Sequence, residues 1–132
     1  MIINGKDAVL GRLASFTAKK LLAGEEVSIV NAENVIITGD SIEITKKYLK
    51  KREIGSPQHG PFFPTKPDLI VRRTVRGMLP YKTNKGRIAF KKLRVYIGTP
   101  AEMQKGESIA VKTVRTSYMT VGDLATQLGW RK

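Results

Sequence analysis

Three arginines, Arg72, Arg73 and Arg76, lie within five positions of each other and suit one kind of chemistry, the binding of phosphate. A guanidinium group holds a phosphate through two parallel hydrogen bonds and also stacks on bases. At helical spacing the three side chains fall within an arc of about 100°, so they can contact adjacent backbone phosphates. Gly77 follows them and leaves room for a nucleic-acid backbone, although a local packing requirement would also explain a glycine there.

The charge around these arginines has one sign. Between Lys46 and Arg94 there are 15 basic and two acidic residues, whereas the rest of the chain holds nine of each. Such crowding destabilises a folded domain unless a polyanion offsets it, and it is the usual electrostatic sign of nucleic-acid binding. A solvated lysine-rich surface that keeps the protein in solution is the alternative, but such surfaces usually mix both signs.

The sequence therefore predicts an RNA-binding surface. No helix carries the Asn or Gln pattern of a DNA-reading element, and the aromatic pattern of an RRM sheet is missing. If about eight of the basic groups meet phosphates, the log–log salt slope of binding is roughly −6 to −7. The predicted charged contacts are Arg12, Lys46, Lys47, Lys50, Lys51, Arg52, Lys66, Arg72, Arg73, Arg76, Lys82, Lys85, Arg87, Lys91, Lys92 and Arg94.

Three uncharged or weakly basic residues complete the predicted surface: Gly77, Tyr81 and His59. Tyr81 suits stacking on an unpaired base, and simple packing is its alternative role. His59 is the only histidine, and no Ser, Cys or Asp pattern around it resembles a catalytic triad. An RNA-acting enzyme centred on His59 and a carboxylate is nevertheless one rival hypothesis, and a DNA-compacting protein is another.

Other chemistry is not indicated. The chain has no cysteine and scattered acids, so we expect no metal site, no cofactor and no small-molecule substrate. The stretch GKDAVLG, residues 5 to 11, lacks the glycine spacing of a dinucleotide fold and the Gly-Lys-Ser/Thr end of an ATPase loop. Gly11 and Arg12 at a helix start suit either a bound phosphate or close packing of the helix on a sheet.

The elements that must position these residues alternate between strands and helices. Helices are expected at 10–23, 41–52 capped by Asp40, 68–79 capped by Asp68, 84–94 and 120–128, where Thr120 starts the helix with Asp123 at the capping-box distance. Strands are expected at 1–4, 26–30, 35–38 and 95–97, with 109–114 a further candidate. Residues 55–67 carry four Pro and two Gly and are expected to form a loop. Opposite the arginines of helix 68–79 lies an expected buried face of Ile70, Val71, Val75 and Met78.

This alternation predicts an α/β domain with a mainly parallel sheet. The 132 residues, 41% of them hydrophobic, fit one domain spanning 1–132. No apolar run approaches the roughly 20 residues of a membrane span, and the N-terminus lacks an export signal, so a cytoplasmic protein is expected.

Several motifs carry a resemblance to a known family. VRGMLPYKTNKGR (75–87) with LRVYIGTP (93–100) closely resembles the signature of the universal large-subunit ribosomal protein thirteen family. VLGRLAS (9–15), VNAENVIITGD (30–40) and LATQLGW (124–130) are similar to further parts of it, in order. The matching signature residues are Arg76, Gly77, Met78, Leu79, Pro80, Gly86 and Arg87.

The resemblance implies a three-layer α/β/α domain around a parallel sheet of about four strands. It also implies a structural, non-enzymatic constituent of the cytoplasmic large ribosomal subunit. Such a protein binds large-subunit ribosomal RNA directly, lies beside other large-subunit proteins and supports early assembly. Lys82-Thr83 and the GSPQHGP loop resemble the archaeal–eukaryotic branch, and an archaeal-type member is expected.

Overall fold

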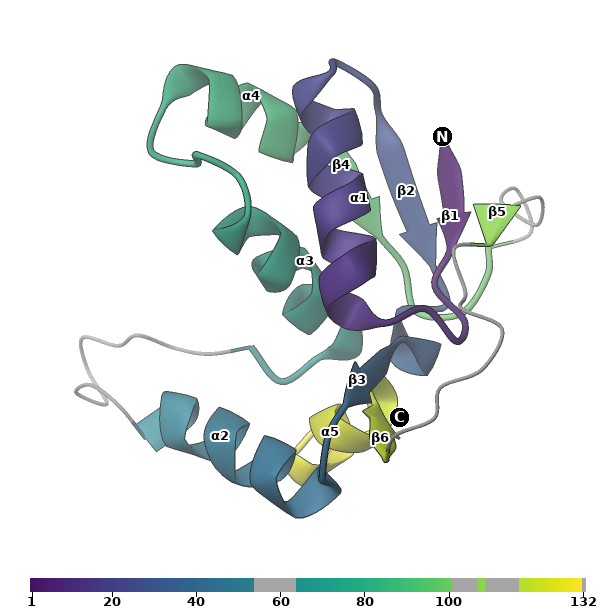
Figure 1. The fold of residues 1–132 in the computed structure, drawn as a ribbon, viewed down its shortest axis with the longest axis vertical. Coiled ribbons are helices and arrows are strands. Elements are labelled where there is room, and N and C mark those ends of the chain that lie inside the picture. The colour runs from purple at the N-terminus through teal and green to yellow at the C-terminus, as the bar shows by residue number, and fades with distance from the viewer. Residues whose placement is uncertain (54–63, 101–106, 109–116, 132) are drawn as a thin grey trace.

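The computed structural model describes residues 1–53, 64–100, 107–108 and 117–131, and for 51–53 and 107–108 it describes the backbone only (Figure 1). His59, most of the Pro/Gly loop and the candidate strand at 109–114 therefore lie outside the described residues. No helix in the described ranges is long and apolar enough to cross a membrane.

The central sheet has four parallel strands in the order β4 (Leu93–Val95), β2 (Val27–Val30), β1 (Ile2–Asn4) and β5 (Glu107–Ser108). At the centre of this sheet, Ile29 of β2 pairs with Ile3 of β1 on one side and with Val95 of β4 on the other. Ile3 and Ile29 are fully buried, as β-branched side chains of a covered parallel sheet usually are. The α/β class and the mainly parallel sheet are thus confirmed.

A second, two-stranded sheet is antiparallel and pairs β3 (Ile36–Thr38) with β6 (Tyr118–Thr120). The predicted strand at 35–38 therefore exists, but it does not join the parallel sheet. Asn31 has a left-handed φ of 57°, and the 3-10 turn η1 (Ala32–Asn34) follows it, so the chain leaves the parallel sheet before Ile36. The strand β6 was not predicted.

Three helices pack together beside the parallel sheet: α1 (Leu10–Leu22), α3 (Pro67–Gly77) and α4 (Asn84–Lys91) (Figure 1). Ile70, Val71 and Val75 of α3 are fully buried, as the helical periodicity predicts. Met78 is 43% exposed, so its predicted place on the buried face is wrong. The helix ends at Gly77, so Met78 is its C-terminal cap and lies beyond the last helical residue.

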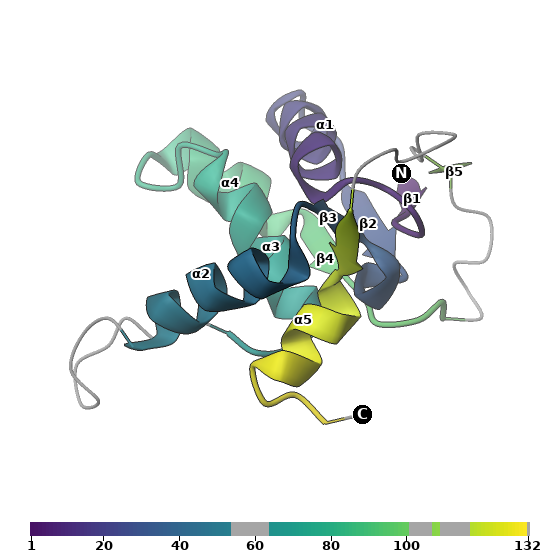
Figure 2. The same cartoon turned by 60° about the horizontal axis from the view of Figure 1, so that its bottom comes forward.

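The remaining helices, α2 (Ser41–Glu53) and α5 (Val121–Gln127), lie at the end of the molecule that holds β3 and β6 (Figure 1), and this end is turned toward the viewer in Figure 2. Both begin at predicted caps. A side-chain oxygen of Asp40 accepts a hydrogen bond from the Ile42 amide at 3.0 Å, and the Thr120 hydroxyl accepts one from the Asp123 amide at 3.1 Å. Such caps satisfy amides that the helix leaves unpaired.

Two element boundaries differ from prediction. The cap of α3 is Lys66, not Asp68, because Pro67 takes the first helical position, where its missing N–H costs nothing. The helix predicted at 84–94 ends at Lys91, and β4 begins at Leu93, two residues before the predicted strand. Leu93 is buried, and it belongs to the sheet and not to the predicted helix.

Candidate nucleic-acid interface

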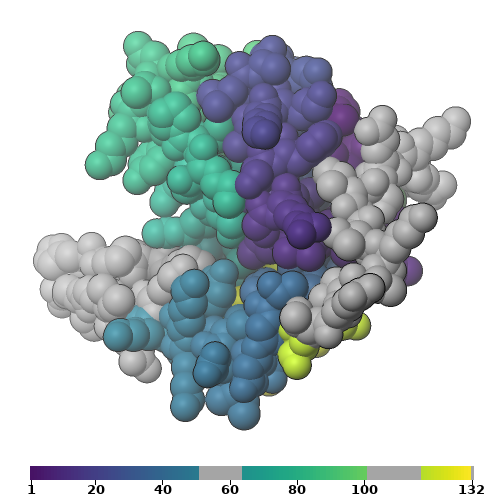
Figure 3. All heavy atoms as spheres, viewed as in Figure 1, coloured from purple at the N-terminus to yellow at the C-terminus, as the bar shows by residue number. Residues whose placement is uncertain are grey.

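A hollow of about 400 Å³ lies between α2 and the C-terminal half of α3. Figure 3 shows the surface indented between the blue spheres of α2 and the teal spheres of the α3 region. This hollow, called the α2–α3 hollow below, brings together two basic segments that are separate in the sequence. It is lined by Lys47, Tyr48, Arg73, Thr74, Arg76, Gly77 and Tyr81.

Arg76 and Tyr81 form a pair at the edge of the α2–α3 hollow. The guanidinium carbon of Arg76 lies 5.0 Å from the centroid of the Tyr81 ring, within the range of a cation–π contact. Two backbone hydrogen bonds hold the turn that carries Tyr81: its amide donates to the Leu79 carbonyl at 2.8 Å, and the Thr83 amide donates to the Pro80 carbonyl at 2.9 Å. The backbone that carries the ring is therefore held in place, and Tyr81 is 39% exposed.

The structure explains one of two glycines of the signature motif, Gly86, by packing, but it does not explain Gly77 in this way. A Cβ atom on Gly86 would collide with the Pro80 carbonyl and lie 2.8 Å from the Tyr81 amide, so α4 packs on the turn only because a glycine stands there. A Cβ on Gly77 would meet nothing within 4 Å, and its φ is not positive. A local packing requirement therefore does not explain Gly77, and close approach by another molecule remains the hypothesis for it.

Arg72 lies on the same helix but has partners inside the protein. Its guanidinium carbon is 4.5 Å from the centroid of the Phe90 ring, and its Nη1 donates to the Leu93 carbonyl at 3.4 Å. These contacts join α3 to α4 and β4. Arg72 thus has a structural role that helical periodicity did not indicate.

Lys92 also makes an internal contact. Its Nζ donates to the carbonyl of Gly24 at 3.2 Å, which ties the end of α4 to the end of α1. Beside this contact is a second hollow of about 380 Å³, lined mainly by apolar atoms of Leu22, Ile88 and their neighbours, with Lys85 at its edge. Of the two described lysines that line this hollow, Lys85 is exposed and Lys92 is half-buried.

Arg73 is half-buried and lines the α2–α3 hollow. The remaining predicted basic residues with described side chains are exposed, and within the described ranges none of them pairs with a carboxylate. Uncompensated cations of this kind repel each other, so an anionic partner would stabilise the fold. Lys51 and Arg52 lie in α2, and nothing further is described of their side chains. The exposed set is Arg12, Lys46, Lys47, Lys50, Lys66, Lys82, Lys85, Arg87, Lys91 and Arg94.

At the start of α1, a Cβ atom on Gly11 would meet nothing within 4 Å. Close packing of the helix on the sheet therefore does not explain this glycine. The neighbouring Arg12 is exposed, and a phosphate at this helix start stays a prediction.

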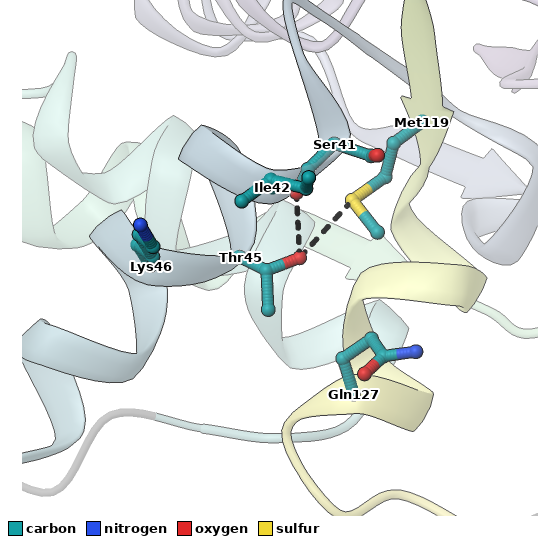
Figure 4. A pocket seen from close by; sticks show the side chains of 6 residues that line it. All are labelled: Ser41, Ile42, Thr45, Lys46, Met119 and Gln127. Carbon is teal, nitrogen blue, oxygen red and sulfur yellow. Dashed lines mark hydrogen bonds between the residues drawn. The ribbon is translucent and has the colours of Figure 1, made fainter.

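A third hollow, of about 320 Å³, lies where α2 meets β6 and α5 (Figure 4). The Thr45 hydroxyl is 2.7 Å from the Ser41 carbonyl and 3.9 Å from the Met119 sulfur. Among the described residues that line this hollow, Lys46 is the one cation.

Sequence reasoning missed two residues of the α2–α3 hollow, Tyr48 and Thr74. Tyr48 directly follows Lys47, and Thr74 lies between Arg73 and Arg76, so closeness to the basic residues was the available signal. Among the described residues, no group of three His, Asp or Glu side chains comes together as a metal site would require.

An α/β domain whose exposed cations lack acidic partners in the described ranges, with an aromatic ring among them, has the features of a protein that binds a polyanion such as RNA. Residues 1–102 match the family described as "Ribosomal protein L13". Proteins named "Large ribosomal subunit protein uL13" are similar over nearly the whole chain. That of Methanocaldococcus jannaschii is 48% identical over 97% of this chain and 96% of its own length, and that of Methanococcoides burtonii is 45% identical over the same shares.

A third relative, from Methanopyrus kandleri, carries the same name and is 44% identical over 98% of this chain and 87% of its own length. This chain belongs to the ribosomal protein L13 family. The resemblance seen in the motifs is therefore confirmed, and so is its archaeal type.

Proposed function

We propose that the basic surface formed by α2, α3, the Tyr81 turn and α4 is where this protein contacts large-subunit ribosomal RNA. The chain is a structural constituent of the large ribosomal subunit and not an enzyme, as its family is. The observation that carries the surface assignment is the set of exposed cations without carboxylate partners in the described part of the chain. Phosphates would supply the missing negative charge.

The surface combines two kinds of contact. Exposed lysines and arginines on α2 and α4 hold the backbone at many points, which supplies affinity without reading sequence. Arg76 and Tyr81 form a rigid polar and aromatic feature between them. Structured RNA recognised by shape suits this combination better than duplex DNA read in its major groove.

Neighbouring large-subunit proteins are the further partners that we propose. Support comes from large apolar side chains that are exposed away from the α2–α3 hollow: Ile42 is 63%, Ile88 58% and Tyr118 54% exposed. Cross-linking within assembled large subunits would test this, and cross-links from these positions to RNA alone would contradict it.

A charge-matched comparison tests the RNA surface. The variant Lys47→Gln/Arg76→Gln/Arg87→Gln removes three cations from it, whereas Lys6→Gln/Lys19→Gln/Arg131→Gln removes three exposed cations outside it. We expect the first variant to bind large-subunit ribosomal RNA at least about tenfold more weakly than the second at moderate salt. Equal losses in the two variants would mean that only net charge matters and would refute the surface assignment.

Competition with duplex DNA separates this proposal from a compacting protein. The intact chain, bound to labelled large-subunit ribosomal RNA, is titrated with unlabelled RNA or with duplex DNA of equal phosphate content. We expect the RNA to displace the probe at much lower concentration. Equal displacement by duplex DNA would favour the general nucleic-acid-binding alternative.

A further inference from the structure

We propose that the α2–α3 hollow holds one unpaired RNA nucleotide, with its base against Tyr81 and its phosphate on Lys47 and Arg76. This inference rests on the proposed function, since it specifies what part of an RNA enters one place on the RNA-binding surface. It goes further because a surface of phosphate contacts alone would accept a regular duplex equally well.

The size of the hollow favours a single nucleotide. Ligand sites in proteins are typically clefts of about 300–1,000 Å³, and this one is about 400 Å³. A base with its sugar and phosphate can enter such a space, whereas a double helix is too wide and can only lie across the rim. A duplex would therefore leave the interior of the hollow unused.

The lining of the hollow offers a partner for two parts of a nucleotide: cations for its phosphate and an aromatic ring for its base. Lys47 from α2 and Arg76 from α3 bring positive charge from both sides, which suits a phosphate. Tyr81 is 39% exposed and held in place by its turn, so part of its ring is open to a base. Arg76 contacts that ring and can hold a phosphate while it fixes the stacking partner.

Thr74 adds a polar group with a defined direction. Its hydroxyl donates to the Ile70 carbonyl at 3.0 Å, so the oxygen keeps only acceptor capacity for a ligand in the hollow that Thr74 lines. An oxygen in this state accepts hydrogen bonds, and an unpaired nucleotide has base N–H groups and a ribose 2′-hydroxyl that can donate them. A phosphate oxygen cannot donate, so Thr74 favours a whole nucleotide over a bare phosphate.

Gly77 opens one side of the hollow. Glycine weakens a helix, and at Gly77 neither backbone conformation nor packing requires it. Without a side chain, the wall next to Arg76 and Tyr81 is low enough for a nucleotide backbone to reach the interior. A large side chain at this position would close that side without removing any charge.

The test uses the intact chain and three RNA probes with the same stem: a fully paired duplex, the duplex with one bulged nucleotide, and the duplex with an abasic residue at the bulge. A stacked base contributes several-fold to affinity, and we expect the bulged probe to bind roughly tenfold more tightly than the paired one. The abasic probe should lose most of this gain. Bulged and paired probes of equal affinity would overturn the inference.

Two variants locate the effect. Gly77→Leu and Tyr81→Leu should each reduce the bulge preference, which is the ratio of bulged-probe to paired-probe affinity, to about twofold or less. Gly11→Leu is the matched control, because Gly11 is also an exposed helical glycine with open space around it, but it does not line the hollow. The Gly11→Leu control should keep the full bulge preference. If Gly77→Leu and Tyr81→Leu also keep it, the proposal that the nucleotide binds in this hollow is wrong.

The two proposals fail in different ways. If the native chain binds no probe and no ribosomal RNA, the proposed function is wrong. If it binds RNA with a steep salt dependence but does not distinguish bulged from paired probes, only the nucleotide site is wrong. Circular dichroism of each variant confirms that it is folded before its affinities are compared.

Discussion

The guanidinium of Arg72 lies over the ring of Phe90, with its carbon 4.5 Å from the ring centroid, and donates from Nη1 to the Leu93 carbonyl. One side chain of α3 thereby contacts both α4 and the first residue of β4. Because α3 and α4 each carry cations of the proposed RNA-binding surface, the Arg72 contacts help to set how these cations are arranged relative to each other. It acts as a positioning residue for the surface.

Replacing Arg72 should therefore lower stability more than replacing an exposed cation. A cation–π contact and a hydrogen bond together contribute about 1–2 kcal/mol, and Arg72→Ala should lower the free energy of unfolding by that amount. Lys85→Ala, at an exposed helical position, should change it by less than about 0.5 kcal/mol. Urea unfolding measures both, and equal values for the two variants would mean that the Phe90 contact contributes nothing.

Gly86→Ala should destabilise the protein although alanine favours helices. The added Cβ would meet the Pro80 carbonyl, and backbone atoms on both sides leave it little room to move. We expect a loss of at least about 2 kcal/mol, since overpacking outweighs a propensity gain of about 1 kcal/mol. Gly77→Ala has no such clash and should leave the unfolding free energy equal or slightly higher. Similar unfolding free energies for Gly86→Ala and Gly77→Ala would contradict the packing role of Gly86.

Much of this fold could be predicted from local sequence signals. Asp40 and Thr120 are caps that the sequence indicates by type and spacing, and both make the expected hydrogen bonds. The apolar periodicity of α3 correctly placed Ile70, Val71 and Val75 in the core. These features depend on residues within one or two helical turns, which a sequence shows directly.

Features that depend on distant pairing could not be predicted. Ile36–Thr38 has the composition of a strand, but only its pairing with Tyr118–Thr120 decides that it leaves the parallel sheet. Arg72 and Arg76 look equivalent on a helical wheel. Phe90 and Leu93 come from α4 and β4, and their position beside Arg72 alone makes its role structural. The same limit concealed Tyr48 and Thr74 in the α2–α3 hollow.

The salt dependence of RNA binding should report how many cations meet phosphates. Each neutralised phosphate contributes about 0.7–0.9 to the log–log slope, so about eight contacts predict roughly −6 to −7. In Lys47→Gln/Arg76→Gln the slope should become less steep by about 1.4 to 1.8. Filter binding of ribosomal RNA over a range of salt concentrations gives both slopes. An unchanged slope would show that neither residue contacts a phosphate.

Tyr48 predicts a loss of stability in alkaline solution. Its side chain is buried in the wall of the α2–α3 hollow, and burial raises the pKa of its phenol above the usual value of 10.0 because an ionised oxygen would lose hydration. Above about pH 10 the unfolded phenol releases its proton while the folded one keeps it. The unfolded state then binds fewer protons, so the free energy of unfolding falls as pH rises until the folded phenol also ionises.

Tyr48→Phe isolates this effect, since lysines that titrate in the same range are present in both proteins. Below about pH 9 the difference in unfolding free energy between native protein and variant should be constant. Between about pH 10 and 11 it should shift steadily in favour of the variant, which has no phenol to ionise. Urea unfolding at a series of pH values measures it. If the unfolding free energies of the native protein and of Tyr48→Phe change in parallel across this range, the Tyr48 phenol ionises equally readily in the folded and unfolded chain.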